Sequence, residues 1–255
     1  MAETLPPLDA WQVSGMRVTA FPAEPTKIDA PSWWIDLLGH PPETQVIRPK
    51  IGQRQEEGEH EGRKLSLQVQ PERIDWVLSP VVKLSEEEPE NLPLAGPFPE
   101  TLNSFLEVVM RWLTMCPPLT RLAFGAVLAQ PVKDRQTGYL HIAKYLHHIR
   151  LDPESSDFFY QINRARPSRT GINDLRINRL SKWSVLLFQR LTVTLEKTSA
   201  KAVEYTGLQS ACRLELDINT APDFPGGTLP QDRLSEVLDE LVGMANEIAA
   251  LGDVP

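Results

Sequence analysis

Alternation of apolar and polar residues with a period of two is the feature that most constrains how this chain folds. In residues 14–21, Met16, Val18 and Ala20 alternate with Arg17 and Thr19, so the two sets point to opposite faces of a strand. The same alternation recurs at residues 65–69, 74–78, 122–128, 158–162, 183–195 and 212–218. Short alternating runs joined by turns are typical of an antiparallel sheet with one face against a core.

Four segments with helical spacing accompany these strands. We expect a short helix over residues 31–39 that ends at a glycine, and longer amphipathic helices over 102–113, 137–148 and 234–251. The sequence therefore predicts an α+β fold with mostly antiparallel strands and helices packed on one face. Both halves of the chain mix helices with hairpins, which leaves two degenerate related halves open as an alternative.

An acidic, proline-rich segment supplies the one candidate boundary. Residues 83–99 interrupt the alternation with a run of glutamates and prolines. They are expected to connect an N-terminal β-rich subdomain, residues 1–82, to a C-terminal α+β subdomain, residues 100–255. The glutamate-rich residues 53–62 are expected to form a charged loop.

Charge and targeting features narrow the class of protein. The formal net charge of −8 excludes a binder of nucleic acid over the whole surface, although a local basic patch is compatible with it. The N-terminus has no basic and apolar leader, and no apolar run approaches the about 20 residues that cross a bilayer. These features predict a cytoplasmic protein without a membrane contact.

One basic segment stands out against the acidic background. Its members are Arg164, Arg166, Arg169, Arg176, Arg179 and Lys182, against the single acid Asp174. Arginine binds phosphate in a bidentate manner, so a hairpin presenting these side chains is a candidate nucleic-acid site. The alternative is a solvated face that pairs with acids of the same chain.

Three histidines and two carboxylates are candidate catalytic or metal-binding groups. On one helix, His147 and His148 point in different directions, and His141 lies two turns away from His148. These side chains cannot reach one ion, so we expect no metal there. A single acid–base histidine, as in a metal-independent nuclease, stays an alternative. Glu215 and Asp217 share a strand face, which suits either a Mg²⁺ ion or a solvent face with Arg213 as partner.

No catalytic or cofactor signature occurs in the sequence. It contains no Gly-x-Ser-x-Gly elbow, no Walker loop and no Gly-x-Gly-x-x-Gly motif, so we expect no cofactor. The two cysteines, Cys116 and Cys212, lie where structural thiols are expected, one at a helix end and one on the apolar face of a strand.

Two apolar features indicate a protein partner or a homo-oligomer. Trp33 and Trp34 are adjacent on a short helix, so both rings can hardly be buried on the same side. The C-terminal helix carries a wide apolar stripe that includes Leu234, Leu238 and Leu241.

A central strand is expected to bury one apolar face, which consists of Trp183, Val185, Leu187, Leu191 and Val193.

The order of elements also resembles a known family. Together with the segment Arg213–Asn219 followed by a helix, it is similar to a sporadically distributed family of uncharacterised prokaryotic proteins. The resemblance implies a bacterial or archaeal cytoplasmic protein, with a link to defence or mobile-element genes as one option, and no residue role. We expect a non-enzymatic binding or assembly component of a multi-protein system. Nucleic-acid binding through residues 164–182 and a metal-independent nuclease are the alternatives.

Overall fold

The computed structural model describes residues 5–28, 32–81, 92–196 and 199–254. The strands are β1 (Gln12–Pro22), β2 (Thr44–Arg48), β3 (Gln53–His60), β4 (Arg63–Gln70), β5 (Arg73–Ser79), β6 (Leu119–Val132), β7 (Phe159–Asn163), β8 (Arg166–Pro167), β9 (Arg176–Glu196) and β10 (Ser199–Thr220). The helices are α1 (Trp33–Leu38), α2 (Phe98–Leu113), α3 (Arg135–Ala143) and α4 (Leu234–Leu251). The chain is thus an α+β protein, as the alternation predicts.

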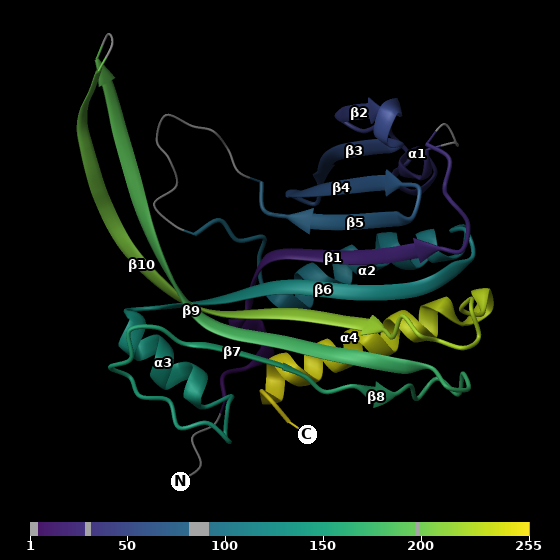
Figure 1. The fold of residues 1–255 in the computed structure, drawn as a ribbon. Helices are drawn as coiled ribbons and strands as arrows, with labels where there is room; N and C mark the ends of the chain where they lie inside the picture. Colours follow the sequence, from purple (N-terminus) through teal and green to yellow (C-terminus); the bar gives the residue numbers. More distant parts are fainter. Residues whose placement is uncertain (1–4, 29–31, 82–91, 197–198, 255) are drawn as a thin grey trace.

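In the described part of the chain, the strands form one ten-stranded antiparallel sheet (Figure 1). Its order is β2-β3-β4-β5-β1-β6-β10-β9-β7, and β8 pairs with β9. The first strand, β1, lies between β5 and β6, so strands from both sides of residues 83–99 belong to the same sheet. Of those residues, 83–91 lie outside the described ranges, and the division into subdomains stays a prediction.

The helices cover one face of the sheet. Val18 lies opposite Trp76 on β5 and opposite Phe124 on β6, and all three side chains are fully buried beneath the helices. The C-terminal helix α4 packs on β6, β10 and β9, and α2 packs on β1. Arg17 and Thr19 point to the other face, as the period of two requires. The helices-on-one-face prediction is therefore confirmed.

All six tryptophans belong to two aromatic clusters. Trp34 stacks on Trp76 with ring centroids 6.3 Å apart, and Trp112 meets Trp76 edge-on at 6.3 Å. Trp11 and Trp183 pack with Tyr145 at the other end of the core. Aromatic burial therefore anchors both halves of the sheet to their helices.

The short helix α1 ends where the sequence predicts. Gly39 adopts φ 75°, a left-handed conformation, and its N–H donates to the carbonyl of Ile35. A side chain would be strained at this φ, so glycine is the residue suited to this helix end.

The prediction of a charged loop over residues 53–62 is wrong, because residues 53–60 form strand β3. Arg54 and Glu56 are buried at 4% and 0% exposure beneath α1. Glu56 accepts hydrogen bonds from Ser32 and Gln45, and Arg54 donates to the carbonyl of Ile28. These tertiary partners compensate for burying charge, which local sequence cannot reveal.

The predicted burial of Leu187 is also wrong. Trp183 is fully buried and Val185 partly buried, but Leu187 is 49% exposed. Beyond residue 184, β9 pairs only with β10 in the described residues, and the two strands project from the sheet as a hairpin arm (Figure 1). None of the helices in the described ranges covers Leu187 there. The side chains of Leu191 and Val193 lie outside the described residues.

The third helix is shorter than expected and ends at Ala143 instead of His148. The next backbone hydrogen bonds are tight turns, from Lys144 to the carbonyl of His141 and from Tyr145 to that of Ile142. The Tyr145 carbonyl accepts a hydrogen bond from the backbone N–H of Asp253, in the C-terminal segment.

Among the described residues, no helix is long and apolar enough to cross a membrane.

Candidate functional site

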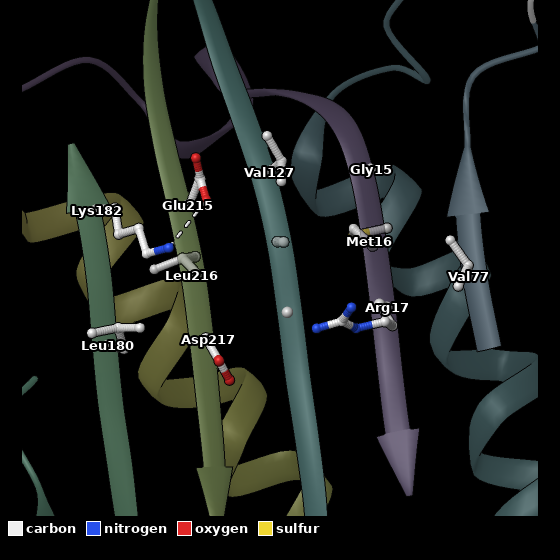
Figure 2. Close-up of a pocket in the computed structure, with 12 residues that line it drawn as sticks. Gly15, Met16, Arg17, Val77, Val127, Leu180, Lys182, Glu215, Leu216 and Asp217 are labelled. Atoms are coloured by element: carbon white, nitrogen blue, oxygen red, sulfur yellow. Dashed lines mark ion pairs between the residues drawn. The ribbon is translucent and has the colours of Figure 1, made fainter. Parts of the chain in front are cut away.

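The uncovered face of the sheet presents side chains from its five central strands. Because each strand alternates, every second residue of β5, β1, β6, β10 and β9 points away from the helices. These side chains are Arg73, Asp75 and Val77; Arg17 and Thr19; Arg121, Ala123 and Val127; Arg213, Glu215, Asp217 and Asn219; and Asn178, Leu180 and Lys182. We call this surface the open face, and Figure 2 shows its central part.

One row across the open face contains a hollow. The strand register places Leu180, Asp217, Gly125, Arg17 and Val77 side by side on β9, β10, β6, β1 and β5. A cavity of about 410 Å³ opens over this row, with Gly125 at its centre. Figure 2 shows Asp217 and Arg17 on its two sides, with helices behind the sheet.

The glycine makes the hollow. A Cβ atom at Gly125 would lie 3.4 Å from the carbonyl oxygen of Leu216 and 3.9 Å from a guanidinium nitrogen of Arg17. The small side chain of Ala123 continues this low floor along β6, and the Arg17 guanidinium reaches toward the floor from β1 (Figure 2).

Arg17 is the most exposed charge at this hollow. Its side chain is 47% exposed, and its Nε lies 3.8 Å from Asp75. Asp75 itself is buried and accepts two hydrogen bonds from Arg73, at 2.6 and 2.9 Å. This pairing raises the pKa of Arg73. Since Arg73 holds Asp75 so closely, the guanidinium of Arg17 remains available to a group above the sheet.

The acids on β10 follow the solvent-face interpretation. Glu215 pairs with Arg213 at 2.9 Å and with Lys182 at 3.8 Å, so the expected partner Arg213 is confirmed. Asp217 accepts a hydrogen bond of 2.9 Å from Asn219. Within the described ranges, no group of three or more histidine, cysteine, aspartate or glutamate side chains could hold a metal ion.

The basic segment is divided between two places. Arg164 donates two hydrogen bonds to Asp253, and Arg179 is buried against Glu247 on α4 at 2.9 Å, with Arg166 at 3.8 Å from the same carboxylate. Lys182 lies apart from them, on the open face.

Arg169 and Arg176 are exposed, and the backbone N–H of Arg169 donates to Glu240. Half of the six cations therefore pair with acids of α4 or the C-terminal segment, which favours the alternative of a self-paired face over a phosphate-binding hairpin.

The pair of Arg164 and Asp253 predicts a specific dependence of stability on pH. Arg164 lowers the pKa of Asp253, whose carboxylate also accepts from the Tyr160 hydroxyl at 2.7 Å. A lowered folded-state pKa stabilises above the unfolded value of about 3.9, and the effect is lost as pH falls through the lowered pKa. We expect Asp253→Asn to cost about 2 kcal/mol at neutral pH.

Thermal unfolding of both proteins from pH 7 to pH 2 checks this expectation. The gap in Tm between wild type and Asp253→Asn should hold above about pH 5 and close progressively below about pH 4. Asp239→Asn is a matched control, because it removes one carboxylate charge at an exposed position on α4. A gap that widens on acidification would contradict the assigned role of Asp253.

The expected partner residues lie mostly inside the protein. Leu234, Leu238 and Leu241 are at most 1% exposed, because α4 packs them on its own sheet. Trp34 is fully buried against Trp76, whereas Trp33 is partly exposed beside Trp112. The structure thus places these leucines and Trp34 in the core and not on a surface where a partner could bind.

The histidines do not form a cluster. His141, on α3, is hydrogen-bonded to the side chain of Gln130, and burial lowers its pKa. His147 and His148 lie beyond the end of α3 and are exposed.

Both thiols are buried and free. Burial raises the pKa of Cys116 and raises that of Cys212 to about 12. A buried thiol that stays protonated is a weak nucleophile, which supports the structural role expected for both cysteines.

The sequence signal for the open face was present but incomplete. Alternation separates Arg17 from Val18, yet nothing local shows that Arg17, Gly125 and Asp217 share one row. No known family model, no curated protein and no solved structure matches this chain. The resemblance to uncharacterised prokaryotic proteins therefore stays a prediction, and the geometry of the open face is the basis on which function is proposed.

Proposed function

We propose that this protein is a non-enzymatic binding or assembly component that presents its open face to a protein partner. The observation that carries the proposal is one-sided coverage: the helices pack on one face of the sheet, and the other displays a central hollow between Arg17 and Asp217. Charges of both signs on one surface can pair with complementary charges of a partner, which gives the contact specificity and register.

A second surface supports a role in assembly. At the base of the hairpin arm, Phe188 is 41% exposed and lines a groove of about 430 Å³ together with Leu92, Leu94 and Pro131. Leu187, which is 49% exposed, points to the opposite face of β9. An exposed aromatic side chain in an apolar groove is typical of interaction sites. A cytoplasmic location and a prokaryotic system linked to defence stay predictions from the sequence.

The test is affinity purification of the tagged protein from its native cells. Val127 lies on the open face opposite Glu215, so Val127→Arg changes the surface and places the new cation beside an acid of the same chain. We expect this variant to lose most of the proteins recovered with the wild type. Lys50→Asp, at an exposed position on the edge of the sheet, should retain them. Identical recovery with all three proteins would exclude the open face as the partner surface.

A further inference from the structure

The row through Gly125 is self-complementary. Reading across the strands, it runs apolar, acidic, glycine, basic, apolar: Leu180, Asp217, Gly125, Arg17 and Val77. Neighbouring strands lie about 4.8 Å apart, so the Cα atoms of Asp217 and Arg17 lie roughly 5 Å to either side of Gly125. Each feature on one side of Gly125 therefore has its complement at the same distance on the other side.

We propose that the open face packs against the open face of a second copy, about a twofold axis that runs parallel to β6 and passes over Gly125. The inference rests on the proposed function and names its partner. Such an axis exchanges the two sides of β6, so Arg17 of each copy faces Asp217 of the other. Leu180 likewise faces Val77, and the two glycines oppose each other.

The next row toward one end of the strands carries Asn219 and Thr19 on the two sides of Ala123. Thr19 is buried and donates to Asp75, and Asn219 donates to Asp217, so these two side chains bring no unpaired charge to the contact. On β6 itself, Ala123 and Val127 lie on the axis and meet their own copies as small apolar contacts. Arg121 also lies on β6, but its guanidinium sits 4.6 Å over the Phe21 ring and donates to Asn219. Its charge is therefore held by its own chain.

Charge decides between the two ways of pairing the faces. An axis perpendicular to the strands would place Arg17 against Arg17 and Asp217 against Asp217 of the second copy. Like charges facing each other at an interface are strongly unfavourable, so the parallel axis is the one that fits. The hollow above Gly125 then leaves room for the paired side chains between the sheets, which pack about 10 Å apart.

The size of the face suits a specific dimer. Five strands span about 24 Å, and nine residues of β6 extend about 30 Å, so two copies would bury on the order of 1,400 Å² together. This area lies within the range of about 1,200–2,000 Å² for specific complexes. We expect a reversible dimer that dissociates on dilution.

Sedimentation analysis of charge-reversal variants tests the proposal. Arg17→Asp and Asp217→Arg each replace two attractive pairs by two repulsive ones, so each should weaken self-association by at least about 100-fold. A 1:1 mixture of the two variants restores both attractive pairs and should form a heterodimer. Lys50→Asp makes the same charge change as Arg17→Asp away from the face and should dimerise like the wild type.

A further variant tests the dimer in case Arg17→Asp or Asp217→Arg does not fold. Val127→Arg places two cations together on the axis, beside Glu215 of their own chains, and should be a folded monomer by circular dichroism and sedimentation. A wild type that stays monomeric up to roughly 0.1 mM would overturn the dimer. So would a dimer that persists in Val127→Arg, or a mixture of the two charge variants that stays monomeric while both are folded.

The outcomes separate this inference from the proposed function. A monomeric wild type that still loses its host proteins in Val127→Arg would leave the open face as a partner surface and overturn self-association alone. A monomer whose host proteins survive Val127→Arg would overturn both.

Discussion

Replacing Trp76 by alanine is expected to lower the free energy of unfolding by about 3–5 kcal/mol. Trp76 is fully buried between Trp34 and Trp112, with both ring centroids 6.3 Å away. Truncation therefore leaves a cavity under two helices at once, because Trp34 belongs to α1 and Trp112 to α2. Chemical denaturation monitored by circular dichroism measures the loss.

Two matched variants sharpen this prediction. The indole N–H of Trp76 has no hydrogen-bond acceptor among the described residues. Trp76→Phe removes that unsatisfied donor along with some volume, so it should cost clearly less than the alanine change. Trp33→Ala removes a partly exposed ring that touches the cluster only at Trp112, and should cost less again. Equal losses for Trp33→Ala and Trp76→Ala would contradict the packing described.

The second large effect is expected at the ion pair between α4 and β9. The Arg179 side chain is 1% exposed and its guanidinium lies 2.9 Å from Glu247, which is 34% exposed. Burial lowers the pKa of Arg179, and the carboxylate of Glu247 opposes that shift. Glu247→Ala would leave a buried cation without this partner. We expect a loss of about 2–4 kcal/mol, below that of a fully buried pair because water screens Glu247.

The controls separate the lost charge from lost packing. Arg166→Ala removes the weaker, 3.8 Å neighbour of the same carboxylate and should cost under about 1 kcal/mol. Adding Arg179→Met to Glu247→Ala removes the uncompensated cation, so the double variant should be more stable than Glu247→Ala alone. If the double variant is the least stable of the set, the loss comes from packing of the arginine and not from its charge.

The sheet also explains where sequence patterns succeed and fail. Strands β1, β4, β5, β6 and β10 carry apolar residues at every second position, so their faces and their burial follow from the sequence. Strand β3 does not, because Arg54 and Glu56 occupy its inward positions and depend on partners from residues 28, 32 and 45. A polar strand of this kind looks like a loop until its partners are known.

The sequence by itself determined which side chains share a strand face, because a period of two is a property of the extended backbone. It thus placed the side chains of Arg17 and Val18 on opposite faces of one strand, and those of Glu215 and Asp217 on the same face of another. Only the tertiary structure decided that Leu180, Asp217, Gly125, Arg17 and Val77 form one row, since their order depends on the register between strands far apart in the chain. It also decided which face the helices leave uncovered and which acids neutralise Arg164 and Arg179. These outcomes depend on contacts across the fold, and no local spacing encodes them.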